Sequence, residues 1–202
     1  MASVQLFVQR GFLVRKLFFA PEYCRRLMAE ASVVPSERGR LVRNGVDGVL
    51  DETTRSVSSA SLSKATRTDL RQRFVEMVPE VETHFGVALA GCEAPGCLVY
   101  DAGAFFAPHT GTGPEDPPAI RRRRVSAIVF LNRQSTERSD GTFCGGTLRF
   151  HGLLDGPEWT ACPLPFESEP GMLVAFRSDL LHEVRPVTSG RRFTVVTWFL
   201  AR

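Results

Sequence analysis

Residues 172–199 read MLVAFRSDLLHEVRPVTSGRRFTVVTWF, and this stretch decides the fold of the chain. Its two ends, 172–176 and 193–199, are short runs of β-branched, aliphatic and aromatic residues, which are typical of strands. The residues around His182 have the pattern of a strand, a polar turn and a second strand. The stretch therefore predicts a β-rich fold in which a strand context holds His182.

Similar runs recur upstream of this stretch. They lie at 97–100, 125–131 and 147–150, and the turn residues that separate the runs are Gly103, Gly113-Pro114, Gly145-Gly146, Gly156-Pro157 and Pro170-Gly171. Short strands at regular spacing that follow helices predict an antiparallel double-sheet jelly roll with the helices outside one sheet.

Two helices are expected before these strands. One runs from Pro21 to about Ser32, because proline suits a first helical turn, and the other from about Arg67 to Phe85 with a break at Pro79. We therefore expect a mainly β protein with flanking helices (α+β): a double-stranded β-helix, or jelly roll, with N-terminal helices packed on one sheet. One domain would span 1–202, with a helical N-terminal part at 1–96 and a jelly-roll core at 97–202.

The remaining N-terminal segments carry weaker patterns. Residues 4–8 and 12–14 are interpreted as short strands broken at Gly11. Residues 33–66 are polar and rich in glycine, serine and arginine, so we expect a loop with short strands, either a mobile wall over an active site or a plain surface loop. The charged residues in this segment that could serve such a wall are Asp51, Glu52 and Arg55.

Composition excludes several classes of protein. The chain of 202 residues is 43% hydrophobic and 23% charged, with a net charge of +3 and five cysteines. No run is long and apolar enough for a membrane span, the cysteines form no CxxC pair, and the N-terminus lacks a signal-peptide core. We expect a cytoplasmic protein without a membrane partner, and we interpret the run Arg121–Arg124 as a solvated loop end, with one or two arginines facing a cavity, rather than a nucleic-acid site.

Two histidines in β-rich contexts are candidate metal ligands. His182 is one, and His109 in Pro108-His109-Thr110-Gly111-Thr112 is the other. Two imidazoles and one carboxylate on one face of a ferrous ion leave positions open for substrate and oxygen. In a strand, residues two apart point to the same side, so position 111 would face the same ion as His109. That position is Gly111, which has no side-chain ligand atom.

Motifs in a fixed order surround these histidines. They are Tyr100-x-x-Gly103, His109 nine residues after the tyrosine, Ser126 through Leu131-Asn132, Gly145-Gly146-Thr147-Leu148-x-Phe150, Pro170-Gly171-x-Leu173-Val174-x-Phe176, His182-x-Val184-x-Pro186-Val187-x-x-Gly190-x-Arg192, and Trp198. In this order the sequence resembles the iron and 2-oxoglutarate-dependent oxygenases, specifically their prolyl 4-hydroxylase-like branch. The resemblance covers about half of the chain, from Tyr100 to Phe199.

The resemblance implies roles for particular residues. His109 and His182 would bind Fe(II), and Arg192 would pair with the distal carboxylate of 2-oxoglutarate, which suits its planar fork. Thr194, on the same strand face, would add a hydrogen bond, and Tyr100 would line the cosubstrate pocket. Fe(II), 2-oxoglutarate and O2 are the implied cofactors. Arg191 competes with Arg192 for the carboxylate, but strand alternation lets only one of the two face inward.

The chain departs from the family pattern at Gly111, where the family carries aspartate. Three hypotheses follow. In the first, the resemblance extends to the superfamily's halogenases, in which chloride binds the iron at this vacant position and the substrate is chlorinated. In the second, the chain is a hydroxylase whose aspartate has been replaced; alternatively, Glu115 or Asp116 from the following loop would serve as a substitute ligand. In the third, it is a non-catalytic binding module. Halogenation of a free small molecule is the leading hypothesis, with chloride as cosubstrate.

Overall fold

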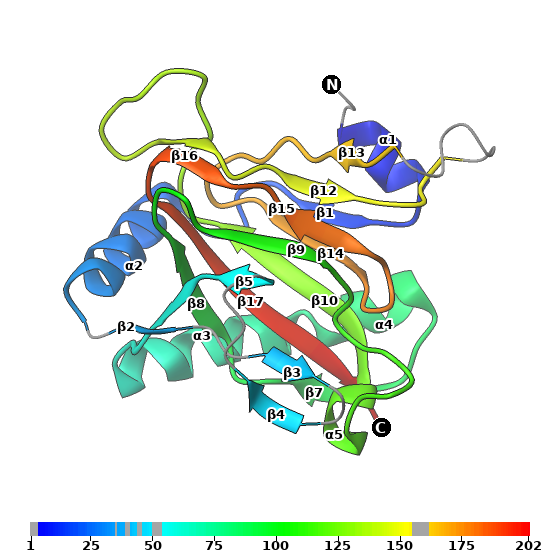
Figure 1. Cartoon of the computed structure of the whole chain (residues 1–202). Coiled ribbons are helices and arrows are strands. Elements are labelled where there is room, and N and C mark those ends of the chain that lie inside the picture. Colours follow the sequence, from blue (N-terminus) through cyan, green and yellow to red (C-terminus); the bar gives the residue numbers. More distant parts are fainter. Residues whose placement is uncertain (1–3, 35, 39–40, 44–45, 50–53, 155–161) are drawn as a thin grey trace.

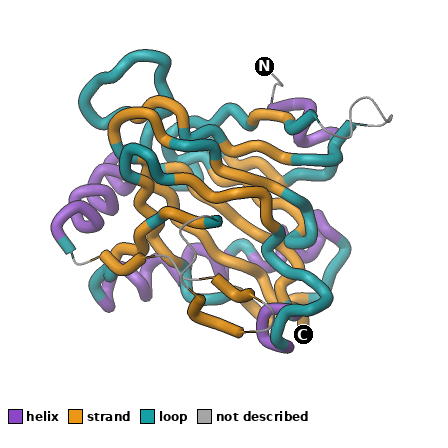
Figure 2. The backbone as a smooth tube through the Cα atoms, viewed as in Figure 1, coloured by secondary structure: helices purple, strands orange, loops and turns teal. Residues whose placement is uncertain are grey.

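The computed structural model consists of two antiparallel β-sheets that face each other, with helices on the outside of the larger sheet (Figure 1). It describes residues 4–34, 36–38, 41–43, 46–49, 54–154 and 162–202. Figure 2 shows the two layers of strands crossing the middle of the molecule and the helices at its edge. The expected double-stranded β-helix with N-terminal helices on one sheet is confirmed.

The larger sheet is built around the longest strands of the chain. In sheet order its strands are β1 (Leu13–Arg15), β14 (Leu173–Arg177), β10 (Arg123–Phe130), β17 (Arg192–Ala201), β8 (Gly96–Tyr100), β6 (Ser58–Ala60) and β2 (Ser36–Arg38), and β7 (Leu89–Cys92) pairs with the far end of β17. Four of these strands come from the first 96 residues, so the N-terminal part is not purely helical.

The smaller sheet lies opposite. Its order is β13 (Leu164–Pro165), β12 (Leu148–Phe150), β15 (His182–Val184), β9 (Phe105–His109) and β5 (Arg55–Ser56). Two separate strand pairs complete the described strands: β11 (Phe143–Gly145) with β16 (Val187–Gly190), and β3 (Leu41–Arg43) with β4 (Val46–Val49). Consecutive segments of the chain thus alternate between sheets, which is how β9 and β15 come to lie side by side.

Side-chain alternation along the larger sheet divides the core in two. On β10, Val125, Ala127 and Val129 face the helices, whereas Ile128 and Phe130 face the smaller sheet. The helices that cover the outer face are α2 (Pro21–Val33), α3 (Lys64–Glu76) and α4 (Val78–Phe85), and α5 (Pro118–Arg121) is a single turn before β10. None of the helices in the described ranges is long and apolar enough to cross a membrane.

Two N-terminal expectations need correction. Residues 4–8, interpreted as a strand, form the helix α1 (Val4–Gln9), which ends where Gly11 adopts a positive φ of 85°. The turn allows Phe7 and Phe12 to pack edge to face at 5.2 Å, so burial of two aromatic rings outweighs the strand preference of the segment. The single helix expected from 67 to 85 is two helices that meet at Met77, because Pro79 favours the first turn of a new helix.

Candidate functional site

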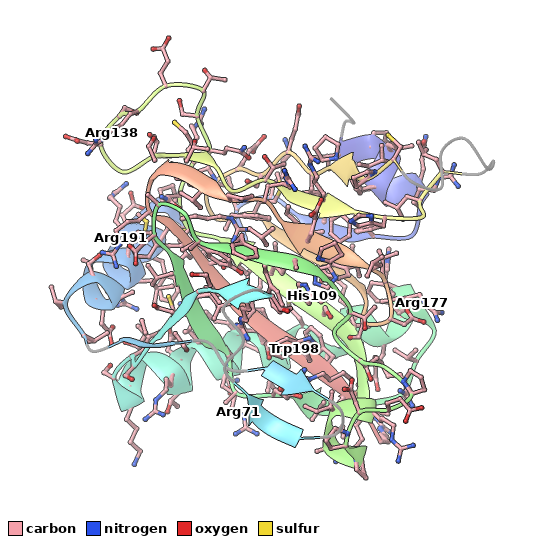
Figure 3. All side chains as sticks on the ribbon, viewed as in Figure 1. Arg71, His109, Arg138, Arg177, Arg191 and Trp198 are labelled. Atoms are coloured by element: carbon pink, nitrogen blue, oxygen red, sulfur yellow. The ribbon has the colours of Figure 1, made fainter. Side chains whose placement is uncertain are left out.

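A cavity of about 770 Å³ opens between the two sheets. It is lined from the smaller sheet by His109 and His182 and from the larger sheet by Ser126 and Trp198, and Gly111 lines it too. Figure 3 shows His109 and Trp198 in the interior between the sheets, whereas the labelled Arg71, Arg138, Arg177 and Arg191 lie at the periphery. The structure therefore brings together both histidines and the glycine that the sequence singled out.

The two histidines are partners across neighbouring strands. His182 on β15 lies directly opposite His109 on β9, and their ring centroids are 4.2 Å apart. Nδ1 of His109 donates to the carbonyl oxygen of Ala107 at 2.8 Å, and Nδ1 of His182 donates to that of Leu180 at 2.8 Å. A backbone acceptor on Nδ1 fixes the tautomer of each ring and leaves Nε2 as the nitrogen with a lone pair.

Apolar surroundings keep both rings neutral. Phe106 stacks on His109 with centroids 3.3 Å apart, and Phe176 packs edge to face on His182 at 4.9 Å. Burial lowers the pKa of His182 to about 4, and burial, followed by the proximity of His182, lowers the pKa of His109 well below its usual value. Neutral imidazoles with a free Nε2 are suitable ligands for a divalent transition metal.

No carboxylate joins the two histidines within the described ranges, where no group of three His, Cys, Asp or Glu side chains has the geometry of a metal site. Asp116, one of the expected substitutes, lines the cavity, but its Oδ2 accepts the backbone N–H of Gly113 at 2.7 Å. Glu115 is exposed. The position beside the histidine pair thus has no protein carboxylate among the described residues.

On the larger sheet, Arg192 is a buried cation without a carboxylate partner among the described residues. Arg192 is 1% exposed, and its Nε and Nη2 have no hydrogen-bond partner among the described residues. Thr194 lies two residues along β17 on the same face, and its Oγ1 is also buried and unpartnered. The guanidinium lies 4.9 Å from the ring centroid of Tyr100, its cross-strand partner on β8.

The unpartnered groups of Arg192 and Thr194 are suited to binding an anion. Burial lowers the pKa of Arg192, but a guanidinium stays charged in proteins, and a buried charge without a partner costs several kcal/mol. Arg191, by contrast, projects outward, and its Nε donates to Asp101 Oδ1 at 2.8 Å. The strand places Arg192 inside and Arg191 outside.

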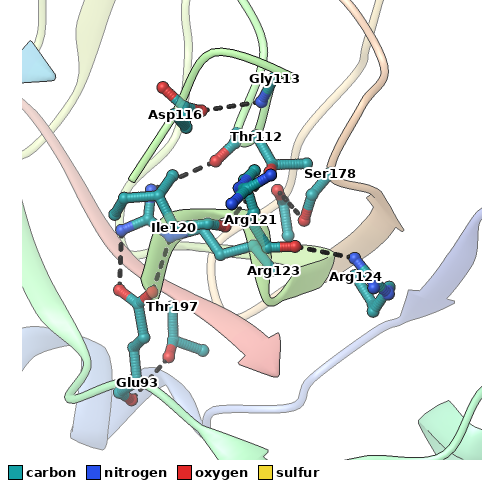
Figure 4. Close-up of polar contacts among 12 residues, drawn as sticks. Glu93, Thr112, Gly113, Asp116, Ile120, Arg121, Arg123, Arg124, Ser178 and Thr197 are labelled. Atoms are coloured by element: carbon teal, nitrogen blue, oxygen red, sulfur yellow. Dashed lines mark hydrogen bonds and ion pairs between the residues drawn. The ribbon is translucent and has the colours of Figure 1, made fainter. Parts of the chain in front are cut away.

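Near Gly111, Arg123 contacts both Glu93 and Trp198, and the sequence did not predict these contacts. Arg123 binds Glu93 through Nε at 2.6 Å and Nη2 at 2.8 Å (Figure 4). The guanidinium of Arg123 also lies 3.8 Å from the ring centroid of Trp198. Only Arg122 and Arg123 of the run 121–124 line the cavity. A basic run was visible in the sequence, but its carboxylate partner lies 30 residues away and on another element.

The segment expected to form a wall over the site is described in part. Arg55 on β5 lines the cavity and lies over the ring of Phe106 at 4.7 Å. Asp51 and Glu52 lie outside the described residues.

One human protein matches part of the sequence. The human 2-oxoglutarate and iron-dependent oxygenase domain-containing protein 2 is 39% identical over 59 residues, which are 29% of this chain and 17% of the human protein. The match therefore spans less than a fifth of that relative.

Solved structures share the fold along almost the whole chain. A prolyl-4-hydroxylase from Pseudomonas putida has a TM-score of 0.69 and 22% identity, over 98% of this chain and 97% of that one. A prolyl hydroxylase from Trichoplax adhaerens, in complex with a hypoxia inducible factor peptide fragment, also has a TM-score of 0.69, with 18% identity over 98% and 86% of the two chains.

The sequence profile of the 2OG-Fe(II) oxygenase superfamily, where 2OG is 2-oxoglutarate, matches residues 95–200. This range is just over half of the chain, and it contains both histidines, Gly111 and Arg192. The chain therefore belongs to the 2OG-Fe(II) oxygenase superfamily, and the name of this family implies dependence on Fe(II) and 2-oxoglutarate.

Proposed function

We propose that this enzyme functionalises a C–H bond of a small molecule by halogenation. In this proposal His109 and His182 bind the iron, and Arg192 with Thr194 anchors the distal carboxylate of 2-oxoglutarate beside Tyr100. The observation that carries the proposed binding of 2-oxoglutarate is the fully buried Arg192. Its Nε and Nη2 are unpartnered among the described residues and lie on the same strand face as the unpartnered Thr194 Oγ1. A carboxylate would satisfy these groups together.

The residues of the chain hold and orient the reactants. The backbone acceptors at Ala107 and Leu180 keep each histidine with Nε2 available, and the phenylalanines around the rings exclude water. Iron, when bound with 2-oxoglutarate and O2, supplies the oxidant that takes hydrogen from the substrate carbon, with succinate and CO2 as coproducts. Arg192 fixes one end of the cosubstrate, so the other end is directed towards the histidines.

Gly111 favours halogenation over hydroxylation. Iron held by two neutral histidines lacks the negative charge that a carboxylate ligand brings, and a halide replaces that charge one for one. Among the described residues no carboxylate completes a metal site with the two histidines, and Asp116 instead accepts a hydrogen bond from the backbone N–H of Gly113. A halide held at this position would supply the atom that replaces the hydrogen taken from the substrate carbon.

The first prediction concerns the product. With Fe(II), 2-oxoglutarate, O2, chloride and a library of candidate small molecules, mass spectrometry should detect a chlorinated product together with succinate. Replacing chloride by bromide should shift the product mass by the difference between the two halogens. A product that carries only a hydroxyl group at every halide concentration would contradict halogenation and support hydroxylation.

Hydroxylation is the second candidate function, and the structural neighbours favour it. Both prolyl hydroxylases match along at least 97% of this chain at TM-scores of 0.69, and one was solved with a peptide. If the enzyme is a hydroxylase, water would occupy the ligand position that we assign to the halide, and a peptide would be the substrate in place of the small molecule. Adding proline-containing peptides to the assay above tests it directly.

The second prediction concerns Gly111→Asp. A Cβ at this position would lie 2.7 Å from Ser126 Oγ and 2.9 Å from Trp198 Nε1, so the aspartate requires these side chains to shift. We expect loss of the halogenated product and a lower free energy of unfolding by about 1–3 kcal/mol, as overpacking typically costs. Product mass and thermal melting measure the two effects.

Gly113→Asp is the matched control, because it adds the same charge to the same loop. Its Cβ would meet only Asp116 Oδ2, at 3.7 Å. If Gly111→Asp chlorinates at the rate of the unsubstituted enzyme, the halide does not bind at this position.

A further inference from the structure

The surroundings of Gly111 form a small site that the function of the histidines and Arg192 does not explain. Gly111 is held on both sides, since its N–H donates to the carbonyl oxygen of Ser178 at 2.7 Å and its own carbonyl accepts from Arg123 Nη1 at 3.2 Å. A glycine fixed in this way cannot retreat to make room for a side chain. Three atoms already occupy the space that a Cβ would need: Ser126 Oγ at 2.7 Å, Trp198 Nε1 at 2.9 Å and Ser178 O at 3.2 Å.

Two of these atoms are hydrogen-bond donors on the cavity wall. Trp198 Nε1 takes part in no hydrogen bond among the described residues, although the side chain lines the cavity. The hydroxyl of Ser126 donates to Ser178 Oγ at 3.0 Å, and it can rotate to accept from Ser178 and donate elsewhere. Ser126 and Trp198 project from the neighbouring strands β10 and β17, where they are cross-strand partners.

Arg123 fixes the indole ring. Glu93 holds the Arg123 guanidinium by two hydrogen bonds (Figure 4). The same guanidinium stacks on Trp198 at 3.8 Å, and the Glu93 backbone N–H donates to the Trp198 carbonyl at 2.8 Å. The carboxylate neutralises the arginine, so this pair orients Trp198 rather than acting as an anion site itself. The indole N–H is consequently preorganised towards Gly111.

We propose that Ser126 and Trp198 are the hydrogen-bond donors that receive the halide at the position left open by Gly111. This inference rests on the proposed function, because the iron site must exist for the halide to bind there. Two neutral donors suit a monovalent anion, whereas a carboxylate side chain at position 111 would collide with both. Ser126 and Trp198 would therefore set the preference for an exogenous anion over a protein ligand.

The test uses the full chain loaded with Co(II) and 2-oxoglutarate, with visible ligand-field bands as readout. Co(II) accepts the same nitrogen and oxygen ligands as Fe(II), and its bands change when its coordination changes. Titration with bromide should shift the bands saturably. Ser126→Ala and Trp198→Phe should each weaken bromide binding by about tenfold or more, the typical loss of a hydrogen bond to a charged group.

Ser61→Ala serves as a matched control, because it removes a hydroxyl from an exposed serine. It should keep the bromide affinity of the unsubstituted protein.

The outcomes separate the two proposals. Absent cobalt bands, or bands that do not respond to 2-oxoglutarate, would overturn the proposed function and this inference with it. Normal bands with a 2-oxoglutarate response but no bromide response would overturn the inference alone, as would equal bromide affinity in all variants.

Discussion

Replacing Arg192 by methionine is expected to abolish 2-oxoglutarate binding while leaving the ligand-free protein folded. Loss of the partner of a buried charge typically costs about 2–5 kcal/mol, which is roughly 30-fold or more in affinity. Methionine is apolar and flexible, so it fills much of the volume and removes the unpartnered nitrogens Nε and Nη2. The ligand-free variant should therefore melt at the same temperature or higher, because an uncompensated buried charge has been removed.

Calorimetric titration with 2-oxoglutarate and thermal melting measure the two effects. Arg191→Met is the matched control: it is the next residue, but its guanidinium is paired with Asp101 at the surface. Its affinity for 2-oxoglutarate should stay within about twofold, as is usual for exposed ion pairs. Unchanged affinity in Arg192→Met, or an equal loss in both variants, would place the carboxylate elsewhere.

The second large effect is expected from His182→Gln. Among the described residues the proposed metal ligands are His109 and His182, so this change would leave the metal with one of them. Fe(II) affinity should therefore fall by more than about 100-fold, since loss of an outer partner alone typically costs 10–100-fold. Competition with a metal-binding dye, under anaerobic conditions, measures this affinity without any turnover. The variant's far-ultraviolet circular dichroism should match that of the unsubstituted protein.

His84→Gln provides the comparison for this experiment. The His84 ring is at the surface, where Nε2 bonds to the carbonyl of Gly11 at 3.0 Å. It should leave Fe(II) affinity unchanged. A His182→Gln variant that retains full affinity would show that another group replaces the histidine and would remove the basis for the vacant position at Gly111.

Local patterns were enough to predict the sheets. The runs at 125–131, 172–176 and 193–199 became the central strands β10, β14 and β17 of the larger sheet. Periodicity succeeded here because these strands are buried on both faces, so nearly every residue is apolar. It failed at 4–8, where Phe7 meets rings such as Phe150 and Phe166 that come from distant parts of the chain.

The candidate ligands of the proposed site could be named from the sequence, whereas their surroundings could not. The motif order pointed to His109, His182 and Arg192, and the structure places the two histidines opposite each other and buries the arginine. The donors around Gly111 were not predicted, because Ser126 and Trp198 are far from position 111 in the sequence and only the packing of the strands brings them beside it.

The sequence by itself was enough to predict the superfamily and the class of fold, and it supplied the candidates for metal and cosubstrate binding that we propose, because motif spacing and alternation along each strand are local properties. Only the tertiary structure decided which arginine is buried with Nε and Nη2 unpartnered among the described residues, and that the space beside Gly111 is closed to a side chain and lined by donors. The physical reason is that burial and steric exclusion are set by contacts between strands such as β9, β10 and β17, whose neighbours in space lie far apart in the chain.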